Sequence, residues 1–403
     1  MLWSLLTAFV VAGIHGVATA ASTAGPAACV TFDINWNLLA FGFNGKDYNA
    51  GTQDTWGSSS PPTDITTQGR PPFDSPNTTC YLAQFFNAIY VLNADNSSPS
   101  SIYIYDVAKA SWSKQSVDAG TFDPTNFAAI LDHDTNVFYS YSGADLFSLD
   151  MQSQTAAISS AIPWKEVQKP DLSTDSDGTT TPGANTAGYQ PVMALAQNHV
   201  HFLGVPGLAA GNAKIFVIHF SFMQPTPQFY GTAFPDTHGK TASFFLDAGV
   251  QQEFAFIPDD GSATYVINVE SNTTKTLTGP PQQDPFASYS ASTSALVQLT
   301  PGGQVAFLAY DPNTTTSGGT WATISKLPSA LGSASSSGTS SAGGSTPTGN
   351  TTSSSSGKNS SSGSPSGSSS GSSNNNSGAV SGVRLGAGIF LAAGMALFGM
   401  LAM

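Results

Sequence analysis

The stretch NAIYVLNADNSSPSSIYIYDVAKASW, residues 87–112, decides the fold. It contains two runs rich in β-branched and aromatic residues, 87–95 and 102–112, with Asn, Asp, Ser and Pro between them. Residues of the first kind favour strands, and residues of the second kind favour turns. No apolar pattern with a period of 3.6 residues extends over helical length. The stretch therefore predicts antiparallel strands joined by turns.

Similar runs recur along the chain at intervals near fifty residues, namely 50, 49, 63, 54 and 51. The longest interval contains an insertion rich in Asp, Thr, Pro and Gly, residues 163–188. Further apolar runs flank each member, so each repeat offers three to four strands and no helix. The six members, each interpreted as the second strand of its repeat, are NLLAFGFNG from Asn37, NAIYVLNAD from Asn87, NVFYSYSG from Asn136, HVHFLGVPG from His199, EFAFIPDDG from Glu253 and QVAFLAYDP from Gln304. In the sixth repeat, SALVQLT (294–300) precedes this run and is interpreted as the first strand.

Four strands in a period of about fifty residues are the signature of a β-propeller blade. The sequence thus predicts an all-β domain with six blades, or seven if the irregular residues 46–78 contain one more. A β-sandwich, or two stacked β domains, is the alternative. The run around Tyr105, Asp106 and Trp112 resembles the kelch-type blade of galactose-oxidase-like propellers, although the family's double glycine is missing. That family includes copper-radical oxidases, which need a cysteine crosslinked to a tyrosine.

The two cysteines, Cys29 and Cys80, begin equivalent runs in the first and second repeats. An isolated pair in an oxidising compartment is most simply a disulfide. We expect it to connect matching inner strands of neighbouring blades, which leaves no cysteine for the copper-radical chemistry. Closing a loop of about 50 residues stabilises the fold by about 4 kcal/mol on the chain-entropy model.

The two ends of the chain predict a secreted and tethered protein. Residues 1–20 are mostly apolar and end in Ala-Thr-Ala, which indicates a signal peptide rather than an uncleaved helix. Residues 331–376 are dominated by Ser, Thr, Gly and Asn and predict a disordered stalk. Residues 377–403 combine small residues, a polar spacer and an apolar tail, as in a glycosylphosphatidylinositol (GPI) signal with attachment at Asn376. A single membrane span is the alternative for this tail.

The ectodomain, residues 22–330, holds all 25 acidic residues and 10 of the 12 basic ones. This balance excludes nucleic-acid binding, which needs a basic surface. Seven Asn-x-Ser/Thr sequons fit a secreted glycoprotein, and four of them fall in predicted turns of the ectodomain: Asn77, Asn96, Asn272 and Asn313. The layout resembles the GPI-anchored, Ser-rich surface proteins of fungi. That resemblance implies a location at the outer face of the plasma membrane or in the cell wall.

Catalytic motifs and cofactor fingerprints are missing from the ectodomain sequence, so we expect no cofactor. His199, His201 and His219 lie near one another, but without a ligating carboxylate at suitable spacing they predict no metal site. Carboxylates recur after the predicted second strands, and they and an aromatic residue in the insertion could form a glycan- or protein-binding surface on one propeller face. The members of this predicted surface are Asp95, Asp259, Asp260, Asp311 and Trp164.

Two functions follow from these patterns. The first is a non-enzymatic surface protein that binds a wall polysaccharide or another surface protein, or contributes to the coat. The second is an extracellular carbohydrate-active enzyme that uses two of these carboxylates as acid and base. Glycosidase chemistry needs the two carboxyl groups about 5–10 Å apart.

Overall fold

The computed structural model describes residues 24–172, 186, 188–231 and 234–328. The predicted signal peptide (1–20), stalk (331–376) and anchor signal (377–403), including Asn376, lie outside these residues. Most of the insertion after residue 172 lies outside them as well. The helices among the described residues are three single-turn 3₁₀ helices, none of which could span a membrane.

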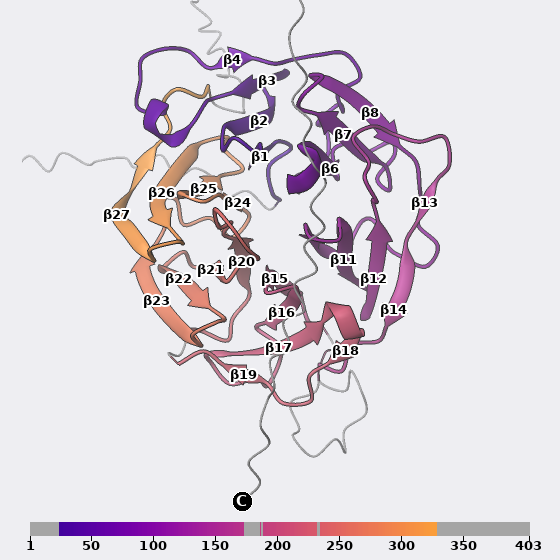
Figure 1. Ribbon diagram of the computed structural model, residues 1–403, viewed down its shortest axis with the longest axis vertical. Helices are drawn as coiled ribbons and strands as arrows, with labels where there is room; N and C mark the ends of the chain where they lie inside the picture. Colours follow the sequence, from indigo (N-terminus) through magenta and orange to yellow (C-terminus); the bar gives the residue numbers. More distant parts are fainter. Residues whose placement is uncertain (1–23, 173–185, 187, 232–233, 329–403) are drawn as a thin grey trace, which may run out of the picture. The chain divides into compact units, whose positions relative to one another are not determined.

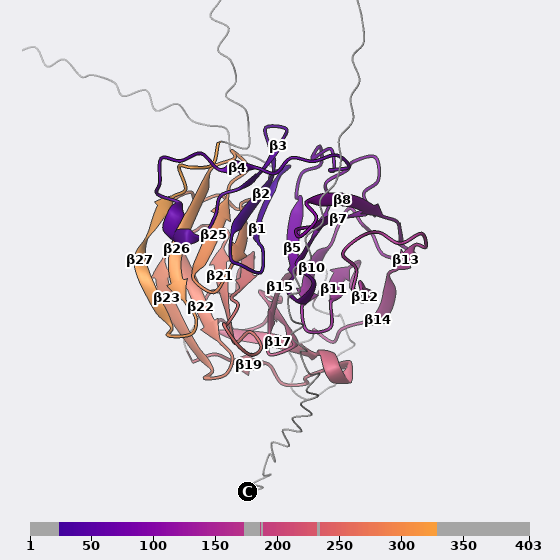
Figure 2. The ribbon, with the colours of Figure 1, turned by 45° about the horizontal axis from the view of Figure 1, so that its top comes forward.

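Six antiparallel sheets surround a central axis as the blades of a propeller (Figures 1 and 2). The first strand of each blade contacts the first strand of the next, and that of the sixth contacts that of the first. The ring of described residues is therefore closed with six blades. This confirms the predicted propeller with the smaller of the two blade numbers, and the β-sandwich alternative is wrong.

Each blade is formed by one continuous segment of the chain. Blade 1 comprises β1 (Cys29–Phe32), β2 (Leu38–Phe43), β3 (Lys46–Asn49) and β4 (Thr63–Asp64), and blade 2 comprises β5 (Thr79–Ala83), β6 (Ala88–Leu92), β7 (Ile102–Asp106) and β8 (Ser111–Gln115). Blade 3 comprises β10 (Ala128–Asp132), β11 (Val137–Ser142), β12 (Asp145–Asp150) and β14 (Lys165–Gln168), and blade 4 comprises β15 (Val192–Ala196), β16 (His199–Leu203), β17 (Asn212–Val217), β18 (Phe222–Met223) and β19 (Gln228–Phe229). Blade 5 comprises β20 (Gly239–Ser243), β21 (Glu253–Pro258), β22 (Ala263–Asn268) and β23 (Thr273–Thr278), and blade 6 comprises β24 (Ser288–Ala291), β25 (Ala295–Leu299), β26 (Val305–Asp311) and β27 (Thr316–Thr323). The remaining elements are a parallel pair, β9 (Val117–Asp118) with β13 (Ile162–Pro163), and the helices η1 (Gln53–Thr55), η2 (Gln84–Phe86) and η3 (Ile218–Phe220).

The second strands explain why the sequence repeats are so apolar. β6 (AIYVL), β21 and β25 are buried at every residue, because each blade is covered by a neighbouring blade on both of its faces. A strand buried on both faces needs apolar side chains in both directions, so its sequence does not alternate. The outer strand β23 (TTKTLT) lies at the rim and is mostly exposed.

Because strand direction alternates within a blade, its turns divide between two faces of the propeller. The linker face carries the turns between second and third strands and the connections from one blade to the next. The far face carries the turns between first and second strands and between third and fourth strands. These two names are used below.

The strand assignment predicted for the sixth repeat is wrong by one position. SALVQLT forms the second strand, β25, and QVAFLAYDP forms the third strand, β26. The first strand, β24 (SYSA), escapes prediction because its polar residues, which are only partly buried at the inner edge of the blade, give no apolar signal. As a result Asp311, the last residue of β26, lies at the far-face end of its strand.

The predicted disulfide is present and connects blade 1 to blade 2. It joins Cys29 in β1 to Cys80 in β5, with the two Cα atoms 5.8 Å apart. The adjacent core includes Phe41 of blade 1, whose ring lies 5.3 Å from Tyr105 and 5.2 Å from Trp112 of blade 2. We call this contact the disulfide seam.

The contact between blade 6 and blade 1 closes the ring, and we call it the closure seam. Its core combines residues of both blades around Trp56, which is only 1% exposed. The Trp56 ring lies 4.9 Å from Phe307 and 6.3 Å from Phe32, and its indole N–H donates to the carbonyl of Gly51 at 2.8 Å. Trp56 therefore belongs to the core of the closure seam.

Candidate functional site

The residues of the predicted binding surface occupy separate places in the structure. Asp95 lies in the β6–β7 loop on the linker face and is 5% exposed. Its carboxylate accepts hydrogen bonds from Tyr103 Oη at 2.7 Å and Lys114 Nζ at 2.8 Å. Burial acts to raise the pKa of Asp95, but hydrogen bonds from Lys114 and Ser97 outweigh it and hold that pKa well below its usual range. In this structure Asp95 fixes the conformation of its own loop.

Asp259 and Asp260 lie together in the β21–β22 turn, also on the linker face. Asp259 Oδ2 is 2.7 Å from His238 Nδ1, and Asp259 Oδ1 is buried without a hydrogen-bond partner among the described residues. Asp260 accepts a hydrogen bond from Ser262 N at 2.9 Å, and the hydrogen bonds from Ser262 lower the pKa of Asp260. Asp260 therefore orders the turn that carries both residues.

Asp311 and Trp164 lie apart from these two. Asp311 accepts a hydrogen bond from Thr314 Oγ1 at 2.8 Å in its far-face turn, so it cannot share a surface with the carboxylates of the linker face. Trp164 is 7% exposed, and its ring stacks on Phe122 with centroids 4.2 Å apart. The structure thus places Trp164 inside the contact between blades 2 and 3. A role of these residues in binding stays a prediction.

A groove of about 520 Å³ opens on the far face at the closure seam. One side comes from blade 1, whose η1 reaches across toward β26 and β27 (Figure 1). The other side comes from the β24–β25 turn and β26 of blade 6. The residues that line this closure groove are Asn35, Trp36, Thr52, Gln53, Asp54, Thr293, Ser294 and Phe307. The volume lies within the range of ligand sites in proteins.

Trp36 is the most unusual residue of the closure groove. Its backbone has a φ of 59°, a left-handed conformation that is a genuine outlier for a bulky residue. The turn is held by Asp33, whose Oδ1 accepts the backbone N–H groups of Asn35 and Asn37, both at 2.9 Å. The Trp36 ring is half-buried and lies 5.2 Å from Phe245 of blade 5. Such strain costs about 1–3 kcal/mol and tends to occur at functional sites.

The remaining lining of the closure groove is polar and carries little charge. Asp54 is its one acidic residue, and its Oδ1 accepts a hydrogen bond from Thr52 Oγ1 at 2.5 Å. The side-chain amides of Asn35 and Gln53 have no hydrogen-bond partner within the described part of the chain, which leaves donors and acceptors available to a ligand. Two aromatic rings with amide, hydroxyl and carboxylate groups between them suit an uncharged, hydroxyl-rich molecule.

Sequence reasoning missed this site. Trp36 is the last residue of the apolar run VTFDINW (30–36), which precedes the second strand of the first repeat, and nothing there distinguishes it from core aromatics. Phe307 was assigned to the wrong strand of its blade. One sequence signal could have found Trp36. Turns favour Gly, Pro, Asn, Asp and Ser, so a tryptophan in the turn DINWN (33–37) is unusual and suggests a role other than forming the turn.

The described residues also contain no group of three or more His, Cys, Asp or Glu side chains that could hold a metal ion. His201 in β16 is fully buried against Tyr230 and Phe254. Burial lowers the pKa of His201 to about 3, so the ring is neutral. His219 lies in η3, where its Nε2 is 3.3 Å from the amide nitrogen of Asn198.

No protein-family model and no curated protein matches this chain. The kelch-type resemblance therefore rests on the residues themselves. Tyr105 and Trp112 face each other across the β7–β8 hairpin, and Asp106 holds its turn through Lys109, whose Nζ lies 2.6 Å from the carboxylate. Membership of the kelch-type family stays a prediction.

Proposed function

We propose that this protein is a tethered extracellular propeller that binds a neutral polysaccharide of the cell surface or wall through the closure groove. The observation that carries the proposal is the strained turn at Trp36, which holds an aromatic ring at the edge of a polar, nearly uncharged groove. Sugar rings stack their apolar faces on aromatic side chains, and their hydroxyls pair with amides and carboxylates. The closure groove offers both kinds of contact.

The surroundings of the buried carboxylates support binding over hydrolysis. Asp47, for example, accepts two hydrogen bonds from Arg70, and Glu253 accepts one from Tyr310 and one from Asn268. Carboxylates fixed by such partners stabilise the fold, whereas a glycosidase needs two of them facing a shared cleft. Asp54 is the one carboxylate that lines the closure groove.

Features of the described residues also support the proposed location outside the cell. The Cys29–Cys80 disulfide is typical of oxidising compartments. The four ectodomain sequons, Asn77, Asn96, Asn272 and Asn313, are all exposed in turns or connections, where a glycan can be attached. The disulfide and the sequons thus agree with the signal peptide, stalk and GPI signal expected from the sequence, and together these features support a location at the cell surface.

The groove is tested by measuring the binding of neutral wall oligosaccharides, such as β-glucan fragments, to the full chain. We expect Trp36→Ala to weaken binding about tenfold or more, because stacking on an aromatic ring contributes about 0.5–1.5 kcal/mol beyond area burial and the turn's preorganisation is lost as well. Phe220→Ala is the matched control, since Phe220 is 81% exposed on blade 4. If folded Trp36→Ala protein binds these oligosaccharides with wild-type affinity, the closure groove is not the binding site.

The tether is tested separately on intact cells that express the chain. Phosphatidylinositol-specific phospholipase C should release the protein into the medium, and Asn376→Pro should reduce the amount at the surface. If the protein stays in the membrane fraction after the anchor is cleaved, the GPI proposal is wrong.

A further inference from the structure

The connection between the first and second strands of blade 5 is longer than the corresponding connection in any other blade. It covers residues 244–252, between β20 and β21, and the next longest is 33–37 in blade 1. We call residues 244–252 the blade-5 loop. Like the other connections of this kind it lies on the far face, and its length allows it to reach beyond its own blade.

The ring of Phe245, in the blade-5 loop, contacts two other blades. Its centroid lies 5.2 Å from that of Trp36 in blade 1 and 5.4 Å from that of His133 in blade 3. His133 lies in the β10–β11 turn and is only 4% exposed. Blades 1, 3 and 5 alternate around the propeller, so side chains from all three can meet only near its axis. Phe245 therefore packs at the far-face end of the axis, in contact with both rings.

The main chain of Phe245 contacts the opposite wall of the closure groove. Its N–H donates to the carbonyl of Ser292 at 3.3 Å. Ser292 directly precedes Thr293 and Ser294, which line the groove from blade 6. The Oγ of Ser292 accepts the N–H of Ser294 at 3.1 Å, which orders this short turn. One residue of blade 5 thus connects the Trp36 wall of the groove with its blade-6 wall.

Further hydrogen bonds hold the blade-5 loop in place. On one side, Asp247 N donates to Asn313 Oδ1 of blade 6 at 3.2 Å. On the other side, the carbonyl of Gln251 accepts the N–H of Gln197 in blade 4 at 2.7 Å. Both neighbouring blades therefore fix the path of the loop. Because these bonds and the bond to Ser292 do not involve the Phe245 side chain, truncating that side chain should leave the path unchanged.

Trp36 is a residue that needs support from a neighbour. Its left-handed backbone is unfavourable for a bulky residue, and its ring is only half-buried. Aromatic pairs prefer particular relative orientations, so the contact with Phe245 restricts the indole ring. A ring that is already ordered does not have to be ordered on binding, which increases affinity. Phe245 does not itself line the closure groove, so it can affect a ligand only through the walls.

We propose that Phe245 is a positioning residue of the closure groove and holds the Trp36 ring in the orientation that stacks on a sugar. This role rests on the proposed function, because it requires a ligand that stacks on Trp36. The affinity of a groove between blades 6 and 1 is then set in part by a loop of blade 5 that does not touch the ligand.

The experiment is a double-mutant cycle in which the binding of β-glucan fragments to the full chain is measured. Phe245→Ala should weaken binding about fivefold, because the Trp36 ring must then be ordered by the ligand. Added to Trp36→Ala, the same change should cause no further loss, since Phe245 acts through that ring. Phe245→Leu keeps an apolar side chain of similar size and should weaken binding about twofold.

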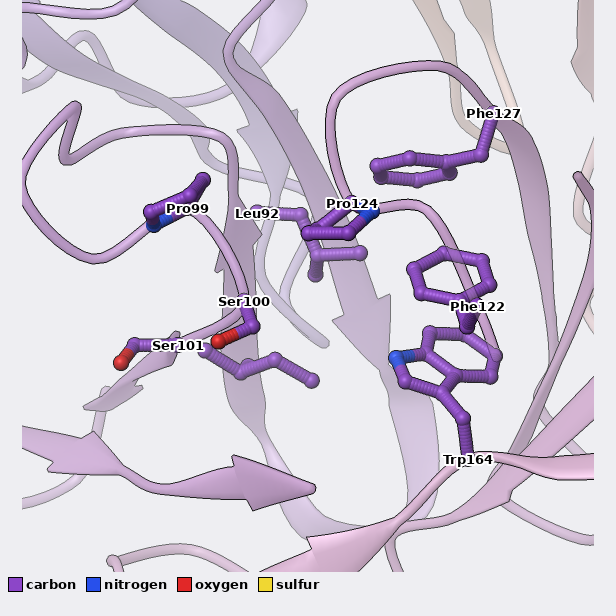
Figure 3. Close-up of a pocket in the computed structure, with 9 residues that line it drawn as sticks. Leu92, Pro99, Ser100, Ser101, Phe122, Pro124, Phe127 and Trp164 are labelled. Atoms are coloured by element: carbon purple, nitrogen blue, oxygen red, sulfur yellow. The ribbon is translucent and has the colours of Figure 1, made fainter. Parts of the chain in front are cut away.

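A second measurement follows the Trp36 ring directly, on the chain labelled with 5-fluorotryptophan. The ¹⁹F signal of Trp36 is assigned by its disappearance in Trp36→Phe. In free Phe245→Ala protein this signal should broaden, because the ring samples several orientations, and it should sharpen again when the ligand saturates the groove. Phe122→Ala is the matched control, since it removes a buried ring that stacks on Trp164 between blades 2 and 3 (Figure 3). It should change neither the Trp36 signal nor the affinity.

The results separate this role from the proposed function. Wild-type affinity in folded Phe245→Ala, or a loss that adds fully to that of Trp36→Ala, would overturn the role of Phe245 and leave the closure groove as the binding site. Absence of binding by the wild-type protein would instead reject the proposed function. In either case, a sharp Trp36 signal in free Phe245→Ala protein would show that Phe245 does not hold the ring.

Discussion

Blade 1 is held to its two neighbours in different ways. Toward blade 2, the disulfide seam combines a covalent bond with an ion pair, in which Arg70 Nη2 lies 2.6 Å from Asp47 Oδ1. The guanidinium of Arg70 also lies 4.9 Å from the centre of the Phe73 ring. This seam therefore uses a crosslink, charge and aromatic packing together.

Toward blade 6, the closure seam depends on side-chain packing. No strand of blade 1 pairs with a strand of blade 6 among the described residues, because each blade is completed within its own continuous segment of the chain. Trp56, Phe32 and Phe307 fill the contact, with Ile324 and Leu327 beside them. A ring closed without an exchanged strand needs large side chains at its junction, and the junction is also where the closure groove opens.

The largest expected effect is at the closure seam. Trp56→Ala removes a fully buried ring and should lower the free energy of unfolding by about 5 kcal/mol, the upper end for a large aromatic residue. Denaturant unfolding followed by fluorescence measures this loss, with Phe220→Ala as an exposed control. A loss below about 1 kcal/mol would mean that the ring is closed by other contacts.

Removal of the disulfide should have the next largest effect. The double variant Cys29→Ser with Cys80→Ser should lose about 4 kcal/mol, because the unfolded chain regains the freedom of a loop of about 50 residues. The same denaturant experiment applies, and reduction of the wild-type protein should give a similar loss. A double variant that is as stable as the wild type would show that packing alone holds this seam.

The ion pair of the disulfide seam should contribute less. Asp47→Asn leaves Arg70 without its charged partner and weakens the hydrogen bond from Gly42 N, so we expect a loss of about 3 kcal/mol. Adding Arg70→Met to Asp47→Asn should recover part of the loss, since the unpaired charge is gone. If the double variant is no more stable than Asp47→Asn, the unpaired charge is not the cause.

The smallest expected effect is a loss of stability in acid, and it arises at the contact between blades 4 and 5. Burial lowers the pKa of His201, between blades 4 and 5, to about 3, whereas the unfolded chain binds this proton near pH 6.5. The unfolded state therefore gains protons first, and stability falls as the pH drops through that window. We expect a loss of about 2 kcal/mol at pH 5 relative to pH 7. His201→Phe should reduce this loss in pH-dependent unfolding; an identical pH dependence would exclude His201.

Most of the fold followed from the sequence because burial on both faces forces second strands to be apolar. The same physics explains the error in blade 6, where β24 is short and polar and the second strand was taken for the first. The disulfide could be predicted because Cys29 and Cys80 occupy equivalent positions in two repeats.

The candidate sites could be predicted only in part. Trp164 was singled out, but its burial against Phe122 depends on how two blades pack, which no local pattern encodes. Asp95 was singled out as a ligand-binding group, whereas its contact with Lys114 joins the β6–β7 loop to β8 and makes Asp95 a support for that loop. Trp36 was missed because its left-handed backbone and its contact with Phe245 of blade 5 depend on the folded ring, and the turn sequence DINWN gives only an indirect signal of them.

The end of the described chain has a mechanical consequence. β27 is the outermost strand of blade 6, and the segment that follows it packs Ile324 and Leu327 into the core of the closure seam. A pulling force on the C-terminal side of the domain would therefore load the closure seam first, while the crosslink between blades 1 and 2 stays outside the direct path of that load. Tension would therefore reach the closure groove, which opens at this seam, before it reached most of the ring.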